Sequence, residues 1–357
     1  MGSGKRGLLT AALTVVCAVT VLAAPGTAFA APAPVPTPAP TPTPLPDKDL
    51  EEVRVKLDEL YHDASVATDA YNAAEEKAEK QSAEIVALAR KIDQGQQRLD
   101  ELKDQAGAAA RDQYRTNGLS STAQFLFTDD PGRFLDGAGR VLQGQRAATG
   151  VMAEMSRTQR ELRAYADDAS AQWKRLEGNR KAKAAAKKKI EQQIDAAEKL
   201  QSRLEKKEKE RLAELEREAA RKAQTAWLDT GVLKDAHDRA SAPGEKAVKY
   251  AAAQLGKPYV WGAEGPDSFD CSGLTSQAWA AAGHPVPRTS QEQWRRLPHV
   301  DVEDMRPGDL VIYFDDASHV ALYIGDGTVI HAPRPGRTVT EAGAGSMPIL
   351  GVVRPDA

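Results

Sequence analysis

The sequence predicts a compact α+β domain at the C-terminus, preceded by a long α-helical coiled-coil hairpin. Apolar residues at alternating spacings of three and four run through most of residues 53–109, which is typical of a coiled coil. Most of the short β-type runs, by contrast, lie after residue 243, where Gly and Pro separate them. The 357 residues are enough for about two domains.

The first 30 residues have the pattern of a secretory signal peptide. Lys5 and Arg6 precede an apolar run from Leu8 to Ala24, and the small-x-small sequence Ala28-Phe29-Ala30 follows. An uncleaved membrane anchor is the alternative, but the run is slightly short for a span and Pro25-Gly26 breaks it. We therefore expect residues 1–30 to be removed and the protein to be secreted, to the cell wall or the extracellular space.

Residues 31–46 read APAPVPTPAPTPTPLP. Alternating proline removes backbone donors and favours an extended polyproline II conformation. We interpret this segment as a Pro-rich linker that holds the following part away from a surface.

Residues 47–228 form the predicted coiled-coil region. Its stripe begins at Val53, Leu57 and Leu60, and only Gln81 and Gly95 interrupt its apolar character. Turn signals at Gly118, at residues 129–132 and at Gly137/Gly139 predict a break, after which a second helical stretch is expected from about residue 141 to residue 227. Two long helices with a broken tip indicate an antiparallel hairpin, and a parallel dimer is the alternative that the sequence leaves open.

The tip carries an apolar patch between Phe125 and Leu135. It is either a docking tip for a membrane partner or the self-packed end of the hairpin. Residues 229–243 then form a predicted linker, and residues 244–357 the predicted α+β domain. The expected strands of that domain are residues 310–314, 320–324, 328–332 and 349–353.

The balance of charges excludes some partners. Lys and Arg total 48 and Asp and Glu total 51, for a formal net charge of −3. This balance offers no broad basic surface for nucleic acid. No cluster of Cys and His has the spacing of a structural zinc site. We therefore expect no metal, no cofactor and no nucleic-acid partner.

Cys271 stands out because it would be the lone cysteine of the exported protein once Cys17 leaves with the signal peptide. Such a thiol pairs between molecules, is buried and inert, or is reactive. Asp270 is a good helix N-cap and Gly283 a plausible residue after the helix end. Cys271 would then lie in the first turn, where the helix dipole favours a thiolate. The carboxylate of Asp270 opposes this unless its charge is used by the cap.

A thiol nucleophile requires a base, and the mature chain has six histidines: His62, His237, His284, His299, His319 and His331. His319 and His331 lie in apolar β-type segments, "SHVALYIG" and "VIHAP". A single histidine on a strand is more often a satisfied core residue. Two histidines on neighbouring strands, together with a helix-capped cysteine, favour a Cys/His site. His319 would be the base, and His331 would hydrogen-bond its imidazole.

The segments "KPYVWGAEGPDSFDCSGL", "PRTSQEQW", "MRPGDLVIY", "SHVALYIGDG" and "VIHAP" together resemble the NlpC/p60 cysteine peptidases. The resemblance covers about residues 244–355 and implies a papain-like fold. It implies that Cys271 is the nucleophile, His319 the general base and His331 the third polar residue. It also implies that Tyr259 lines the active site and that Asp270 and Ser272 shape the substrate pocket.

The resemblance further implies cleavage of peptidoglycan stem peptides, most often between D-γ-glutamate and the diamino acid. A coil before such a domain is similar to secreted cell-wall endopeptidases in which the coil restrains the active site or docks on a membrane division complex. A spacer function for the coil is the alternative. A coil-based adaptor or activator with a degenerate peptidase domain is a second hypothesis, and an acyltransferase or amidase on the same fold is a third.

Overall fold

The computed structural model describes residues 45–115, 131–233 and 239–357. The predicted signal peptide, nearly all of the Pro-rich linker and residues 125–130 of the apolar patch lie outside these ranges. Phe134 and Leu135, the described part of that patch, are exposed on a helix. None of the helices in the described ranges is both long enough and apolar enough to pass through a membrane.

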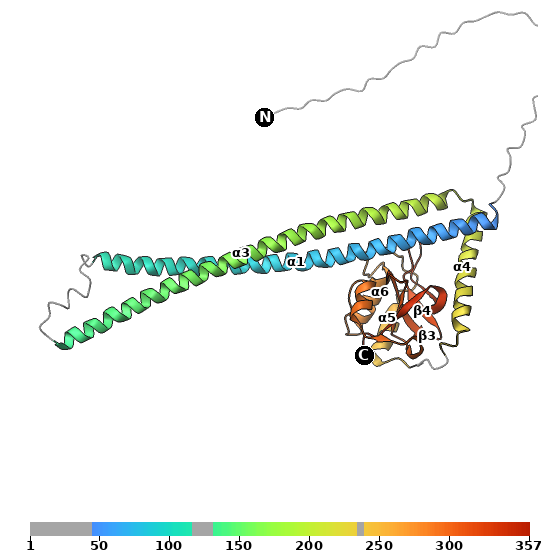
Figure 1. Cartoon of the computed structure of the whole chain (residues 1–357). Helices are drawn as coiled ribbons and strands as arrows, with labels where there is room; N and C mark the ends of the chain where they lie inside the picture. The colour runs from blue at the N-terminus through green and yellow to red at the C-terminus, as the bar shows by residue number, and fades with distance from the viewer. Residues whose placement is uncertain (1–44, 116–130, 234–238) are drawn as a thin grey trace, which may run out of the picture. The chain divides into compact units, whose positions relative to one another are not determined.

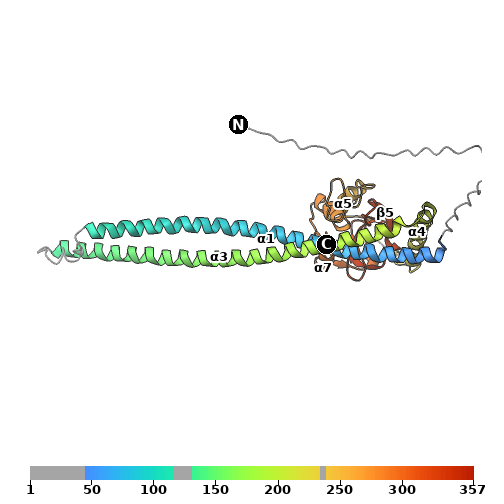
Figure 2. The same ribbon diagram turned by 90° about the horizontal axis from the view of Figure 1, so that it is seen from above.

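Two long helices, α1 (Asp47–Arg115) and α3 (Pro131–Ser202), run side by side (Figures 1 and 2). Their contacts join rising residue numbers on α1 to falling numbers on α3. The Gln193 amide donates to Asp63, Lys183 pairs with Glu75, and the Asn179 amide donates to Gln81 at 2.9 Å. The two helices therefore pack antiparallel within one chain, as a hairpin. We call α1 and α3 together the arm.

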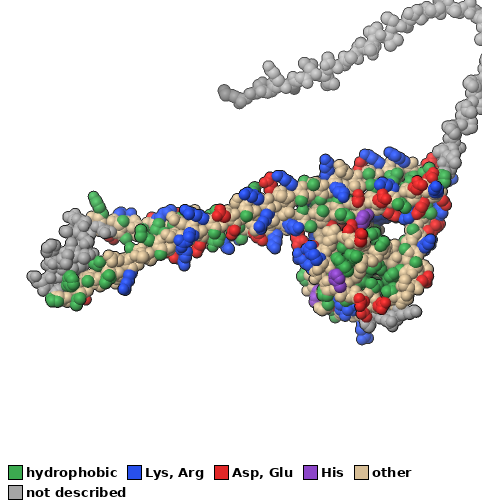
Figure 3. Space-filling view, in the orientation of Figure 1, with side chains coloured by type: hydrophobic (Ala, Val, Ile, Leu, Met, Phe, Trp, Pro, Cys, Tyr) green, Lys and Arg blue, Asp and Glu red, His purple; other side chains and the backbone are tan. Residues whose placement is uncertain are grey.

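The two non-apolar members of the α1 stripe both serve this packing. Gln81 accepts the hydrogen bond from Asn179 across the hairpin. At Gly95 a Cβ atom would lie 2.7 Å from Cδ2 of Leu162, so the helices approach closely there. Elsewhere on the arm, charged side chains of both signs are scattered among neutral ones on the visible surface (Figure 3). The hairpin thus has a narrow apolar seam and a highly charged exterior, as the stripe predicts.

The second helical stretch differs from the expectation in two ways. Gly137 and Gly139 do not delay it, because α3 already begins at Pro131, a residue well suited to a first helical turn. The stretch is also divided in two, since α3 ends at Ser202 and α4 (Lys206–Leu228) begins after a short turn. In the turn Leu204 is buried, and Glu205 and Glu208 form a reciprocal capping box that starts α4.

The C-terminal part is an α+β domain built on one antiparallel sheet with strand order β1-β6-β2-β3-β4-β5. Its strands are β1 (His299–Val300), β2 (Leu310–Tyr313), β3 (His319–Gly325), β4 (Thr328–His331), β5 (Thr340–Gly343) and β6 (Ile349–Val353). Its α-helices are α5 (Ala242–Ala252), α6 (Cys271–Ala281) and α7 (Ser290–Arg296). The four predicted strands are confirmed, whereas the short β1 and β5 were not expected.

Alternate residues of the central strands face opposite sides of the sheet, because the side-chain period of a strand is two. Ile312 and Leu322 belong to a core shared with Trp279 of α6. Val311 and Tyr323 belong to a second core, against which Trp227 of α4 packs. The sheet therefore lies between helices on both faces, and α4 is part of that cover. The predicted fold class, a long helical region followed by an α+β domain, is confirmed.

Candidate active site

Helix α6 begins at Cys271 because Asp270 caps it. Oδ1 of Asp270 accepts a hydrogen bond from the Gly273 amide at 2.6 Å, which confirms the predicted N-cap. A Cβ atom at Gly273 would lie 2.2 Å from the backbone oxygen of Ala263, so no larger residue fits there. The predicted end is confirmed as well, since Gly283 follows the C-cap with φ +89°.

The thiol of Cys271 lies against the beginning of β3. Backbone amides of Val320 and Ser272 donate hydrogen bonds to its sulfur, and the side chain is only 4% exposed. Val320 directly follows His319 on β3, so the predicted nucleophile contacts the strand at the residue next to the predicted base.

His331 at the end of β4 completes the arrangement. Its Nδ1 atom lies 2.9 Å from Nε2 of His319, so the predicted imidazole–imidazole hydrogen bond is present. Both histidines are buried, at 3% and 6% exposure. Because Nε2 of His319 is engaged with His331, Nδ1 is the ring nitrogen that remains for the thiol.

Tyr259 and Ser272, two further residues predicted for the substrate pocket, lie close to Cys271. Tyr259 packs in the core cluster that contains Cys271. Burial raises the pKa of its phenol well above the usual value, and the nearby Cys271 and Asp270 add to this rise. The hydroxyl of Ser272 accepts a hydrogen bond from Arg288 at 2.9 Å. Four of the six predicted site residues, Tyr259, Asp270, Cys271 and Ser272, thus lie at the start of α6, and the two histidines lie on β3 and β4.

Arg288 is a site residue that the sequence reasoning did not single out. Its guanidinium donates to both oxygens of Asp270, at 3.0 and 2.7 Å, and to Glu264 at 2.6 Å. Such a bidentate contact fixes the carboxylate of the N-cap. The signal was present within the segment "PRTSQEQW", but nothing in the local pattern shows that this arginine reaches residues 16–18 positions earlier.

Helix α1 covers the site. The Asn72 amide donates to Oδ2 of Asp270 at 3.1 Å, and the Ser290 hydroxyl donates to Asp69 at 2.5 Å. Tyr71 makes an edge contact with Trp261, with ring centroids 5.1 Å apart. Asp69 and Asn72 are each 2% exposed. This polar stretch of α1, residues 68–72, therefore closes the surface over Asp270 and Tyr259.

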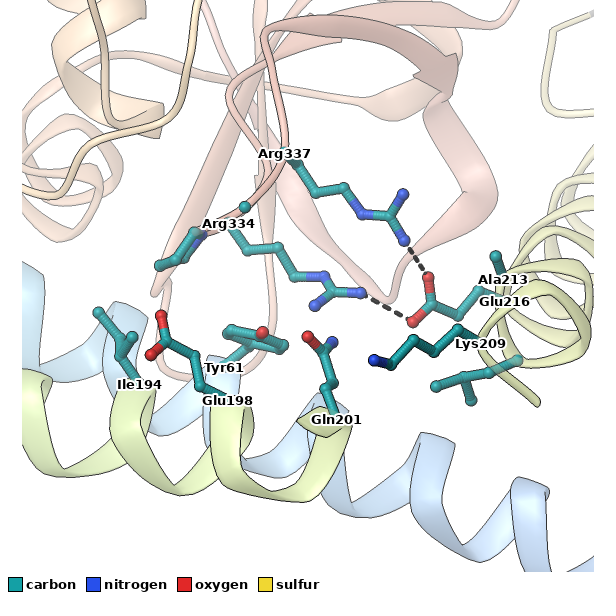
Figure 4. A pocket seen from close by; sticks show the side chains of 12 residues that line it. Tyr61, Ile194, Glu198, Gln201, Lys209, Ala213, Glu216, Arg334 and Arg337 are labelled. Carbon is teal, nitrogen blue, oxygen red and sulfur yellow. Dashed lines mark hydrogen bonds and ion pairs between the residues drawn. The ribbon is translucent and has the colours of Figure 1, made fainter. Parts of the chain in front are cut away.

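A second contact region joins the arm and α4 to the loop after β4 (Figure 4). Glu216 of α4 binds Arg334 at 2.8 Å and also pairs with Arg337. The Arg334 guanidinium lies 4.1 Å from the centre of the Tyr61 ring, a cation–π distance. These residues line a cavity of about 270 Å³ that also borders α3.

Helix α4 also contacts the domain directly, close to the edge of the sheet formed by β5. The Gln224 side chain accepts from the Gly345 amide at 2.6 Å and donates to the Gly327 carbonyl at 3.1 Å. The Trp227 side chain lies so close to Gly345 that a Cβ atom there would be 2.4 Å from Cβ of Trp227 and 2.5 Å from Cγ of its ring. This part of the predicted coiled-coil region thus packs as a component of the α+β domain.

A separate cavity of about 450 Å³ borders His319. Its walls come from α1, α4 and the domain, and include His62, Phe314 and Met347. His62 lies 3.2 Å from Asp316 and packs edge-on against Phe314. The histidine side of the site thus borders open space, while residues 68–72 of α1 close the Asp270 side.

The electrostatics of this closed arrangement differ from the expectation for Cys271. Burial raises the pKa of its thiol well above the usual value, and the carboxylates of Asp270 and Asp69 add to the effect. The backbone amides at the sulfur oppose the rise without reversing it. The helix start therefore does not produce a thiolate while α1 covers the site.

The two histidines are held neutral. Burial lowers the pKa of His319 well below the usual value, and the neighbouring His331 lowers it further. Burial also lowers the pKa of His331, to about 4. Thiol and imidazoles are thus all uncharged in the covered site. In the described ranges no group of three or more His, Cys, Asp or Glu side chains is arranged to hold a metal ion.

A cysteine on a helix start, packed against a strand that carries a histidine held by a second polar residue, is consistent with the arrangement of papain-like cysteine peptidases. Residues 256–347 match the NlpC/P60 family. The chain thus carries an NlpC/P60 domain at its C-terminus.

Relatives with assigned names cover only part of the chain. A probable endopeptidase of Corynebacterium glutamicum is 39% identical over 140 residues, which are 39% of this chain and 66% of that protein. A gamma-D-glutamyl-L-lysine dipeptidyl-peptidase of Bacillus cereus is 36% identical, over 32% of this chain and 37% of that protein. The solved NlpC/p60 domain of the peptidoglycan hydrolase SagA is 31% identical, with 31% of this chain and 97% of that domain covered and a TM-score of 0.30.

Proposed function

We propose that the protein is a secreted cysteine endopeptidase that cleaves peptidoglycan stem peptides during wall remodelling or cell separation. The observation that carries the proposal is the placement of Cys271 in the first turn of α6, against the strand that bears His319. His331 holds that imidazole through Nε2 at 2.9 Å. An intact set of this kind favours an active enzyme over an adaptor with a degenerate domain.

The chemistry follows from these groups. His319 takes the thiol proton, and the sulfur attacks the peptide carbonyl carbon to give a tetrahedral intermediate. The imidazole then returns the proton to the leaving amine, and water hydrolyses the thioester. Because both imidazoles are neutral, His319 is in the form that accepts a proton.

We propose the bond between D-γ-glutamate and the diamino acid as the target. The relative from Bacillus cereus is named for a gamma-D-glutamyl-L-lysine bond, which supports the choice. The family match itself spans residues 256–347 and so includes Cys271 and both histidines.

The first test compares the chain with its Cys271→Ala variant on purified peptidoglycan. We expect solubilised muropeptides from the parent and none from the variant, because no other group can form the thioester. A suitable matched control is Ser276→Ala, five positions further along the same buried helix, which should keep most of the activity. Equal release by the parent and by Cys271→Ala would reject the assignment of the nucleophile.

We further propose that the arm restrains the enzyme by covering the site. Thr68, Asp69 and Asn72 of α1 lie over Tyr259 and Asp270, where substrate must come. Replacing buried Thr68 by Trp should lift α1 and raise hydrolysis at least tenfold, whereas Ala70→Trp, two positions along on the exposed face, should not. Equal rates for the three proteins would favour a spacer.

Export and a division-complex partner complete the proposal. The basic and apolar start of the sequence supports export, and N-terminal sequencing of the secreted protein should find Ala31 first. Exposed Phe134 and Leu135 support a docking tip. Replacing both by Asp should abolish localisation at division sites while hydrolysis in solution is unchanged. Unaltered localisation would reject the tip as the contact.

A further inference from the structure

Asp69 is a carboxyl group buried in the contact between α1 and the peptidase domain. Its side chain accepts hydrogen bonds from the hydroxyl of Ser290, at 2.5 Å, and from the Ser290 backbone amide. Ser290 is fully buried and Asp69 is 2% exposed. An acidic side chain in such a place must carry a proton or a paired cation, because an isolated buried charge is strongly disfavoured.

The surrounding charges do not supply a free cation. The guanidinium that acts on Asp69 among the described residues is that of Arg288, and it already binds Asp270 and Glu264 through short contacts. Asp270 adds a negative charge to the same enclosure. Two carboxylates thus already share one arginine, and ionised Asp69 would be a third. The other titratable groups of the enclosure, Tyr259 and Cys271, are held neutral by burial.

The pKa of Asp69 follows these surroundings. Burial raises it to about 8, and the Asp270 carboxylate contributes to the rise. The hydrogen bonds from Ser290 and the charge of Arg288 oppose the rise but do not cancel it. Near neutral pH the covered site therefore holds a protonated Asp69.

The contact between α1 and the domain around Asp69 also contains a buried polar atom without a hydrogen-bond partner among the described residues. Asn72 donates to Asp270, but its Oδ1 atom is buried without a hydrogen-bond partner in the described part of the chain. An unpaired buried oxygen disfavours the closed arrangement, since water would solvate it if α1 moved away. Polar contacts thus hold α1 over the site. The protonation state of Asp69 should therefore strongly affect how firmly α1 stays in place.

We propose that Asp69 is a proton-controlled latch: protonated, it holds α1 over the active site, and its ionisation releases α1. This inference rests on the proposed function, because it names the regulation of the same site. It identifies the proton as the ligand and the carboxyl of Asp69 as the group that binds it. Release would expose Asp270, Tyr259 and the entrance to Cys271 together.

The direction of the pH effect follows from linkage. An exposed aspartate titrates near 3.9, roughly four pH units below covered Asp69. Because the covered state binds the proton more tightly, covering is strongest at low pH and weakens roughly tenfold per pH unit between about 4 and about 8. From pH 6 to pH 8 the ratio of released to covered molecules should rise roughly 50-fold.

The test measures the position of α1 directly in the full chain. With Cys17 and Cys271 replaced by alanine, spin labels at Glu76→Cys on α1 and Arg295→Cys on α7 report one distance by pulsed electron resonance. Both positions are exposed. We expect a single short distance at pH 6 and a growing population of longer distances at pH 8 and above.

Asp69→Asn should keep the short distance at every pH, because the amide can accept from Ser290 but cannot ionise. Asp63→Asn is the matched control, since Asp63 bonds Gln193 of α3 rather than the domain, and it should respond as the parent does. His62→Gln removes a separate contact between an α1 histidine and a domain carboxylate, His62–Asp316, and should leave most of the response.

A parent without pH-dependent distances, or an Asp69→Asn protein that opens like the parent, would overturn the latch. Neither result would bear on the peptidase activity, because the labelled protein lacks Cys271. Failure of the proposed function would instead appear as absent muropeptide release by the Thr68→Trp protein, whatever the position of α1.

Discussion

Nε2 of His319 and Nδ1 of His331 are 2.9 Å apart across neighbouring strands, and both side chains are buried. This single contact decides which nitrogen of His319 is available to the thiol. It also makes the two imidazoles a coupled pair in which protonation of one disfavours protonation of the other. His331 is therefore a positioning residue, and its effect on hydrolysis should pass through His319.

We expect His331→Ala, in the released Thr68→Trp background, to lower kcat by roughly 10²–10⁴-fold with little change in KM. The reason is that the imidazole of His319 loses the partner that fixes its tautomer. His331→Gln can still hydrogen-bond the ring and should retain more activity than His331→Ala. Steady-state kinetics on a stem peptide would show whether kcat falls while KM is unchanged. A kcat for His331→Ala within about threefold of its parent would contradict this role.

The neutral state of buried His331 predicts an acid-sensitive fold. Its pKa is about 4 in the folded protein and about 6.5 for an exposed imidazole. The unfolded chain therefore binds the proton first, so stability is full above about pH 6.5 and falls as pH drops towards 4. The difference corresponds to about 3 kcal/mol. Urea unfolding of the parent and of His331→Gln between pH 7 and pH 4 should show the smaller loss in the variant.

Gly273 should tolerate no side chain. A Cβ atom there would lie 2.2 Å from the Ala263 carbonyl oxygen and 2.9 Å from the capping oxygen of Asp270. Because the first clash is with backbone, Gly273→Ala should cost about 1–3 kcal/mol of stability and most of the activity. Gly178→Ala, on α3 with nothing within 4 Å, is the control and should be neutral or slightly stabilising. Thermal unfolding of both variants tests this prediction. Equal changes in Tm would show that the clash at Gly273 is wrongly assigned.

Trp227 should stabilise the peptidase domain although it belongs to the long helical region. It packs on the core of Val311 and Tyr323 and against Gly345. Trp227→Ala should lower the free energy of unfolding by about 2–4 kcal/mol, less than the full cost for a completely buried tryptophan. Trp173→Ala, on the exposed face of α3, should change it by less than about 0.5 kcal/mol. Equal losses in urea titrations would show that α4 is not part of the domain.

Local signals carried much of the sequence prediction. The cap at Asp270, the end at Gly283 and the four main strands depend on neighbours in the chain, so residue types alone indicate them. The heptad stripe similarly predicted the coiled coil, with Gly95 as one of its members, and the broken tip indicated a hairpin without excluding a parallel dimer. The turn at Leu204 was missed because it contains neither Gly nor Pro. It forms because Leu204 enters a core with Leu57 and Leu212, which no local pattern reveals.

The contacts between α1 and the site could not be predicted from the sequence. Thr68, Asp69 and Asn72 are polar and lie off the apolar stripe, so they resemble an ordinary solvated helix face. Their partners are about 190 to 220 residues away. For the same reason the pKa of Cys271 was expected to fall: the helix start is visible in the sequence, whereas the burial beneath α1 and the charge of Asp69 are not.

The central claim is that Cys271 and His319 hydrolyse the D-γ-glutamyl–diamino acid bond. Mass spectrometry of muropeptides released by the Thr68→Trp protein tests it most directly. We predict products that end at D-glutamate, paired with fragments that begin at the diamino acid, and no such products from the same protein with Cys271→Ala. Products cut at another bond, or identical products from the two proteins, would contradict the account.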